Sequence, residues 1–324
     1  MRKGKAAVLA SILLSATLQA GTGTDLAHTY SIVAYDSATG EFGAAVQSHY
    51  FKVADVIWAE PGVGVVATQS FVDFAYGPLG LAMMRLGKPA DWALKGLLAS
   101  DSTNQARQVA MIDRQGRVAV YTGEKCIEAA GHLSGKHYSC QANLMTKNTV
   151  CGAMAVAFEE TRGSLAERMM AALEAAQREG GDIRGKQSAA MLVVSGTPTG
   201  QAWRDRIVDL RVDDSPEPLV ELRRLLNLNK AYKMVDRGDE LITEGKIDEA
   251  AKAYSEAAAL TPGNVEISFW QAVTFVEQGQ IEKALPIFKQ VFAADPAWRD
   301  LVPRLVKSNL LKDDARLIER IISQ

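Results

Sequence analysis

A block near the C-terminal end of the chain occurs twice, and the two copies are 34 residues apart. Three pairs of matching features carry this period: Gly245 to Ala250 with Gly279 to Ala284, Tyr254 with Phe288, and Pro262 with Pro296. Self-similarity at this spacing is typical of stacked helix-turn-helix units, whose small residues let helices approach closely. Residues 229–324 are therefore predicted to fold into an all-α array.

The period and the closing proline are the tetratricopeptide signature. Gly238 and Ala272 take matching positions in the first helix of each unit. Because two units are few for independent stability, we expect Val302–Ile322 to form a capping helix over the last exposed face. Arrays of this class bind protein segments on a concave surface, so the tail predicts a protein partner. Self-association through an exposed Trp270 or Trp298, and with it a homo-oligomer, stays an open alternative.

Residues 29–213 combine strands with intervening helices. The predicted strands are 29–35, 41–48, 55–59, 64–69, 109–113, 118–122, 188–195 and 208–212. The predicted helices are 80–86, 90–99 and 164–179, and 150–158 gives a mixed signal. This order does not alternate strand and helix, so it favours a layered α+β domain. An acidic, proline-broken stretch begins at Asp213 and predicts a linker over 214–228.

The N-terminus has a basic start, an uncharged apolar run and a small-residue cleavage site ending at Ala20. This pattern predicts a signal peptide over 1–20, export to the periplasm or the medium, and a short extension or propeptide over 21–28. About 304 residues remain (324 less 20), enough for two domains. No later run approaches the ~20 apolar residues of a membrane span. The formal charge of −2 gives no indication of nucleic-acid binding.

The three cysteines allow at most one disulfide. Cys140 and Cys151 flank a short polar stretch that could join two extended segments, so a bridge between them and three free thiols are equal alternatives. The chain lacks a Cys-x-x-Cys pair and has only four histidines, which argues against a zinc site. We predict neither a metal nor a cofactor.

Four strings carry a resemblance to a known family: TYSIVAYD (29–36), GAAVQSH (43–49), GVVATQS (64–70) and GGDIRGKQSAAMLV (180–193). In their order and spacing they resemble the family called domain of unknown function 1028, over residues 29–213. The resemblance implies the fold of the N-terminal-nucleophile hydrolases, a four-layer αββα sandwich. Enzymes with that fold often cut amide bonds, which implies a small amide or peptide substrate and no cofactor.

In this resemblance the strand-opening threonine of the family falls on Thr29. Its hydroxyl would attack an amide carbonyl, and its freed α-amine, with a pKa near 8, would take the proton. Cleavage after Ala20 leaves Gly21 to His28 in place, so the mechanism needs a second cut between His28 and Thr29, which could be autocatalytic. Otherwise Thr29 is an ordinary β-branched strand residue and the protein is a non-catalytic binding module. Ser31, two residues on, is a fallback nucleophile.

Other polar residues stand at strand ends, where sites are built. Ser48 and His49 end the second strand, and Gln69 with Ser70 ends a later one, where they could stabilise a developing oxyanion. A glycine-rich loop brings further candidates for substrate binding: Asp182, Arg184, Gln187 and Ser188. Arg184 could hold a carboxylate, or pair with Asp182 and merely shape the loop. Asn143 is a further candidate, although it follows Ala142 where the family favours glycine.

Overall fold

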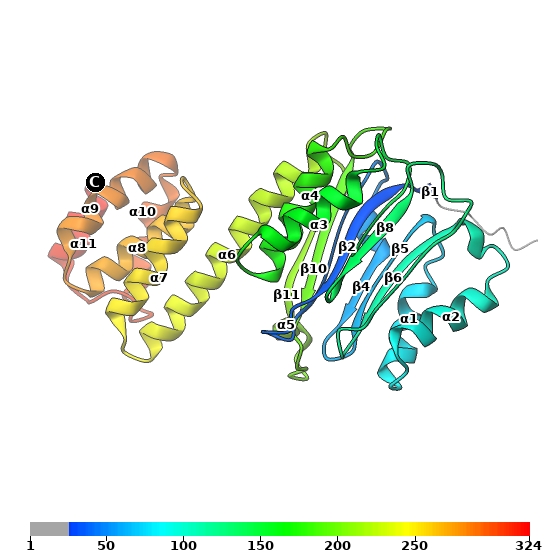
Figure 1. Ribbon diagram of the computed structural model, residues 1–324. Helices are drawn as coiled ribbons and strands as arrows, with labels where there is room; N and C mark the ends of the chain where they lie inside the picture. The colour runs from blue at the N-terminus through cyan, green and yellow to red at the C-terminus, as the bar shows by residue number, and fades with distance from the viewer. Residues whose placement is uncertain (1–25) are drawn as a thin grey trace, which may run out of the picture.

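Two antiparallel β-sheets pack face to face in the N-terminal part of the computed structural model, which describes residues 26–324 (Figure 1). The first sheet has the order β1-β5-β6-β7, with β4 also paired to β5. Its strands are β1 (Leu26–Ala27), β4 (Ile57–Glu60), β5 (Gly64–Phe71), β6 (Arg107–Asp113) and β7 (Val118–Thr122). The predicted signal peptide and residues 21–25 lie outside the described residues.

The second sheet has the order β11-β10-β3-β2-β9-β8. Its strands are β2 (Thr29–Tyr35), β3 (Phe42–Ser48), β8 (Gly131–Gly135), β9 (Tyr138–Ala142), β10 (Ser188–Val194) and β11 (Arg206–Val212). The central strand β2 pairs in register with β3 on one side and β9 on the other, so Thr29 lies opposite Ser48. Thr29 is therefore the first residue of a central strand of this sheet.

Helices cover the outer face of each sheet and complete the predicted four-layer αββα sandwich. The first sheet is covered by α1 (Tyr76–Arg85) and α2 (Ala90–Ser100). The second is covered by α3 (Val150–Glu160), α4 (Leu165–Arg178) and the first half of α6 (Pro218–Thr243). Shorter pieces are α5 (Ala202–Asp205) and the 3-10 turns Val53–Val56 and Asn104–Ala106. The mixed α+β prediction is confirmed.

Strand alternation divides the second sheet into an outer and an inner face. On β2, Tyr30 and Ile32 point toward the helices, whereas Val33 belongs to the apolar cluster between the sheets. That cluster also holds Phe42 and Ile112, both essentially inaccessible. Burying a side chain of this size stabilises the fold by about 1.5–3 kcal/mol. The layer between the sheets is thus apolar except at the end where β2 begins.

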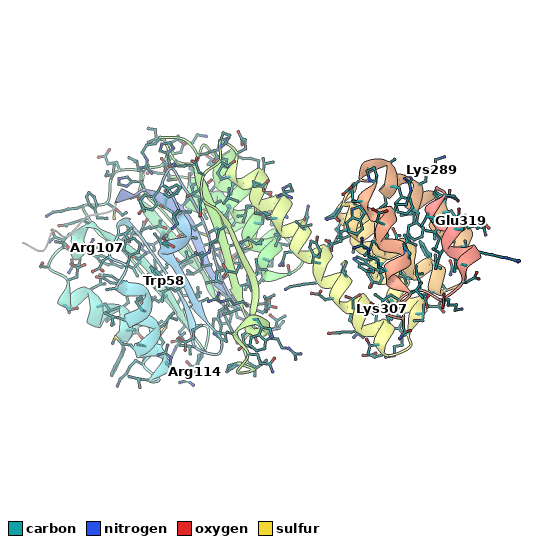
Figure 2. The ribbon with its side chains drawn as sticks, turned by 180° about the vertical axis from the view of Figure 1, so that it is seen from behind. Trp58, Arg107, Arg114, Lys289, Lys307 and Glu319 are labelled. Carbon is teal, nitrogen blue, oxygen red and sulfur yellow. The ribbon has the colours of Figure 1, made fainter. Side chains whose placement is uncertain are left out.

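The C-terminal tail consists of helices that pack in antiparallel pairs at the far end of α6 (Figures 1 and 2). They are α7 (Ile247–Leu260), α8 (Val265–Glu277), α9 (Ile281–Ala294), α10 (Ala297–Leu301), the 3-10 turn Val302–Leu305 and α11 (Ala315–Ile322). The short distance between two helices explains why one position of the repeat needs a small residue. A Cβ on Gly238 would lie 2.8 Å from the ring of Tyr254, so this close crossing of α6 and α7 requires glycine.

Two predicted boundaries in the tail are corrected. The predicted linker 214–228 is largely helical, because Pro218 is tolerated in a first helical turn and Leu219, Leu222 and Leu226 form a stripe that packs on the sandwich. The predicted capping helix 302–322 is interrupted, because Asp314 accepts hydrogen bonds from two backbone N–H groups and starts a separate helix. The capping role itself fits, since Leu311 and Ile321 are buried in the tail core.

Smaller differences concern the sandwich. The segment with mixed signal is the helix α3, so Cys151 lies on a helix rather than in an extended segment. The first predicted helix begins earlier, at Tyr76. The strand expected from Asp55 begins instead at Ile57, after a 3-10 turn. Within residues 26–324, no helix has the length and apolar character that a membrane crossing requires.

Candidate active site between the two sheets

A buried polar cluster occupies the end of the inter-sheet layer where β2 begins. Its members come from both sheets and are fully buried: Thr29, Ser31, Ser48, Gln69, Gln108, Gln141 and Asn143. Buried polar groups require hydrogen-bond partners, and here they are largely one another's partners. The strands that position them also pack the apolar layer, so the cluster sits on rigid elements.

Thr29 is held at the centre of this cluster. Its hydroxyl lies 2.8 Å from the carbonyl oxygen of Ala27 and 3.1 Å from the Ser48 hydroxyl, and its single proton can go to either. Its own carbonyl oxygen accepts bonds from the Asn143 backbone N–H and the Gln69 side-chain amide, each 3.1 Å long. The residue is therefore fixed from both sheets.

The carbonyl group just before Thr29 has two side-chain donors. The oxygen of His28 accepts a hydrogen bond of 2.6 Å from Ser48 Oγ and one of 2.8 Å from Arg184 Nη2. Arg184 is itself oriented by Asp182, whose two carboxylate oxygens lie 3.1 Å from Nε and 2.7 Å from Nη2. The Asp182 side chain is fully buried and that of Arg184 is 29% exposed. A positive charge is thus held at this carbonyl by a partly buried ion pair.

His28 is buried beside this carbonyl. Its Nδ1 lies 2.9 Å from the side-chain oxygen of Asn143, and its ring meets Phe71 edge-on. Burial lowers the pKa of His28 from its ordinary value, although the bond to Asn143 acts in the opposite direction. Burial therefore favours the neutral imidazole.

Glutamines link the two sheets behind Thr29. Gln69 donates to Gln108 at 2.7 Å, and Asn143 donates to the same oxygen at 2.9 Å. Ser31 donates to Gln69 and accepts from Gln141, at 2.6 and 2.7 Å, so its hydroxyl is fully engaged. Sequence reasoning missed Gln108 and Gln141. Both are polar residues at inward-facing positions of otherwise apolar strands, and this pattern could have identified them.

Other predicted site residues lie outside the Thr29 contacts. His49 is exposed, and its backbone N–H reaches Asp182 Oδ2 at 3.3 Å. Gln187 donates to Asp214 at 3.2 Å, and Ser188 donates to the Tyr50 carbonyl and accepts from the Val53 N–H. These last two shape the loops around β10. The structure thus gathers Thr29, Ser48, Gln69, Asn143, Asp182 and Arg184, and leaves His49, Gln187 and Ser188 at the periphery.

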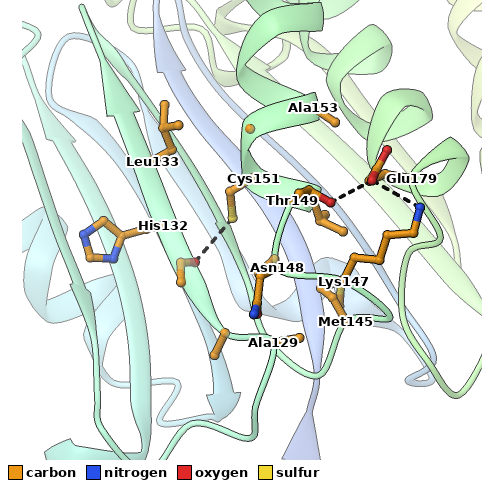
Figure 3. Close-up of a pocket in the computed structure, with 15 residues that line it drawn as sticks. Ala129, His132, Leu133, Met145, Lys147, Asn148, Thr149, Cys151, Ala153 and Glu179 are labelled. Carbon is orange, nitrogen blue, oxygen red and sulfur yellow. Dashed lines mark hydrogen bonds and ion pairs between the residues drawn. The ribbon is translucent and has the colours of Figure 1, made fainter.

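A separate cavity of about 560 Å³ lies between β8 and the start of α3, and none of the predicted site residues lines it (Figure 3). Its lining includes Cys151, whose thiol donates to the Gly131 carbonyl at 3.4 Å. Lys147 and Thr149 both contact Glu179 at its other side. Most residues that line the cavity are apolar, and the charged side chains of Lys147 and Glu179 pair with each other.

The cysteines are free thiols, so the alternative without a bridge holds. Burial raises the pKa of Cys140 far above its usual range and that of Cys151 to about 12. We expect Ellman's reagent at pH 8 to leave Cys140 and Cys151 unmodified in the native protein, because the reactive thiolate is scarce. In denaturant it should titrate all three thiols. A titre of one thiol in denaturant would contradict this.

The fold and cluster define a four-layer αββα sandwich with a polar inter-sheet site, joined to a tetratricopeptide tail. Residues 29–222 match the family described as "Family of unknown function (DUF1028)", and the chain belongs to that family. Residues 241–305 match the tetratricopeptide repeat, and repeats of this class make the tail a protein-interaction element.

A solved structure supports this assignment. The chain resembles the crystal structure of protein SPO2555 from Silicibacter pomeroyi, a member of the same family, with 30% sequence identity and a TM-score of 0.56. The likeness covers 61% of this chain and 88% of that one. No curated protein matches this chain.

Proposed function

We propose that the sandwich is an exported, self-processing amide hydrolase in which Thr29 is the nucleophile. The observation that carries the proposal is the pair of donors on the His28 carbonyl, Ser48 at 2.6 Å and Arg184 at 2.8 Å. Donors fixed on a carbonyl oxygen stabilise the negative charge that develops there when a nucleophile attacks. This carbonyl belongs to the bond whose cleavage would free the amine of Thr29.

The described residues then act as follows. The Thr29 hydroxyl oxygen bonds to the His28 carbonyl carbon, and the bond from that carbon to the Thr29 nitrogen breaks. The hydroxyl proton moves to the leaving nitrogen, which becomes the free α-amine. The His28 acyl group is now an ester on Thr29, and one water hydrolyses it to a His28 carboxylate and the original hydroxyl. The mature site holds a hydroxyl beside an amine suited to act as its base near pH 8.

The segment ahead of Thr29 indicates the kind of substrate that such a site would take. Residues 26–27 pair with Phe71 and Ser70 of β5 as an antiparallel strand. Once released, this segment would leave a strand edge and the two carbonyl donors behind it. An extended peptide or acylated amino acid could add to that edge through its main chain, with its amide at Ser48 and Arg184. A small peptide-like amide is therefore the substrate class proposed.

The intact mass of the protein exported by a bacterial host tests the proposal. A chain that begins at Thr29 supports processing at His28. A chain that begins at Gly21 contradicts it, because Thr29 then has no free amine.

Ser48→Ala and Arg184→Ala are each expected to slow self-cleavage by about 10²-fold or more, since removing one donor of this kind typically costs that factor. The rate is measured by mass spectrometry of freshly synthesised chain over time. Lys186→Ala is the matched control, because Lys186 is in the same loop but pairs with Glu217. Cleavage at the normal rate in both donor variants would refute their role.

The second candidate function is a non-catalytic binding protein. It is favoured by the contact of the Thr29 hydroxyl with the Ala27 carbonyl and by the pairing of residues 26–27 with β5. In this case residues 26–28 are a permanent part of the fold. The same mass measurement separates the two candidates.

A further inference from the structure

The tail contains a groove that is separate from the Thr29 cluster. It has a volume of about 510 Å³ and is lined by residues of α6, α7 and α8, together with Asn309 and Leu310. Tyr232 and Trp270 contribute aromatic surface to it, and the buried Tyr254 lies beneath. Tyr232 is 36% exposed and Trp270 is partly exposed, so rings are accessible from the groove.

All the charged side chains among the described residues that line the groove are negative. Four carboxylates line it, namely Asp236, Asp239, Glu266 and Glu277, and no lysine, arginine or histidine is among its described lining residues. Tyr232 donates to Glu266 at 2.7 Å, and Tyr254 donates to Asp239. These partners are neutral phenols, so they orient the carboxylates without neutralising them. Within residues 26–324, none of the four carboxylates forms an ion pair.

The carboxylates are spread along the groove rather than gathered at a point. Asp236 and Asp239 belong to α6, whereas Glu266 and Glu277 stand at opposite ends of α8. No group of three or more acidic, histidine or cysteine side chains within the described part of the chain is arranged to hold a metal ion. A ligand with several separated positive charges therefore fits this surface better than a single cation.

We propose that this groove binds an extended protein segment rich in lysine or arginine. The carboxylates complement its cationic groups, and the aromatic rings accept the alkyl stems and the cation faces of the same side chains. The protein partner of the tail is therefore basic, whether or not Thr29 is catalytic.

A binding assay with the full chain tests this inference. Fluorescence anisotropy would compare a short labelled peptide of alternating alanine and lysine with its alanine–glutamate counterpart. The lysine peptide should bind, more weakly as salt rises, and the glutamate peptide should not. The double variant Asp236→Asn, Glu277→Gln should weaken binding by about tenfold. It leaves both tyrosine contacts in place, which protects the fold of the groove.

The matched control is the double variant Asp300→Asn, Glu319→Gln, which changes the net charge equally. Asp300 lies on α10 and Glu319, labelled in Figure 2, lies on α11. Neither residue lines the groove. This control should bind the lysine peptide like the parent. Equal loss in both double variants, or equal binding of both peptides, would overturn the inference. Free spermidine that competes at the same concentration as the peptide would also overturn it, because the groove would then recognise a small polyamine.

Discussion

Replacing Thr29 with alanine is expected to leave the chain uncut at His28 and to abolish amide hydrolysis. The variant keeps the donors Ser48 and Arg184 but lacks the oxygen that attacks, and it never gains a free amine at residue 29. Loss of both nucleophile and base predicts a fall in turnover of roughly 10⁴-fold or more. Intact mass reports the cut, and a panel of short peptide amides and acylated amino acids reports turnover.

Thr29→Ser is the informative companion, because it keeps a hydroxyl at the same position. It should still be cut and should retain measurable turnover, since the chemistry needs the oxygen and not the methyl group. Ser31→Ala removes a hydroxyl from the same strand face two residues on and should still be cut at His28. Turnover in an uncut Thr29→Ala chain would assign the chemistry to another residue.

The intact mass and the turnover of the parent chain, taken together, distinguish the two proposed functions. A cut parent chain that hydrolyses none of the amides would support self-processing and contradict the proposed substrate class. An uncut parent chain would make residues 26–27 a permanent strand on β5, as expected for the binding protein. The tail's partner can be sought in either case, because the groove is formed by α6 to α8.

Much of the fold was predictable because local sequence patterns determine most of its helices and strands. The 34-residue period marked the tail, and strand alternation with glycine turns marked most of the sandwich. The predicted boundaries that were wrong depend on packing between segments that are distant in the sequence. Nothing local shows that Pro218 begins a helix whose leucines dock on the second sheet, or that Asp314 rather than Val302 starts the last helix.

The site was predictable in part for the same reason. Thr29, Ser48 and Arg184 lie in strings that resemble the family, and pairing of β2 with β3 brings the first two together. Gln108 was overlooked, because only the packing of one sheet on the other turns it toward Asn143. Ser188 stays a prediction, because its contacts with Tyr50 and Val53 are those of a polar residue that opens a buried strand and fixes a turn.

Phe288→Ala is expected to destabilise the tail while the stability of the sandwich stays unchanged. Phe288 is fully buried and packs against Phe269 and Phe292, with ring centroids 5.7 Å away in each case. Truncating a buried phenylalanine to alanine typically costs about 3–5 kcal/mol. Two repeats have little stability in reserve, because each unit is supported only by its neighbours. The melting temperature of the tail should fall by roughly 10 °C or more.

The helix α6 explains why the damage should stop before the sandwich. Its residues up to Leu226 belong to the core under the second sheet, whereas Ala231 to Leu241 belong to the core of the first repeat. Calorimetry should show two transitions, with only the lower one shifted, and hydrogen exchange should increase in α7 to α11. Lys289→Ala, at the exposed next position, should shift neither. A single transition lowered as a whole would mean that α6 couples the two cores into one cooperative unit.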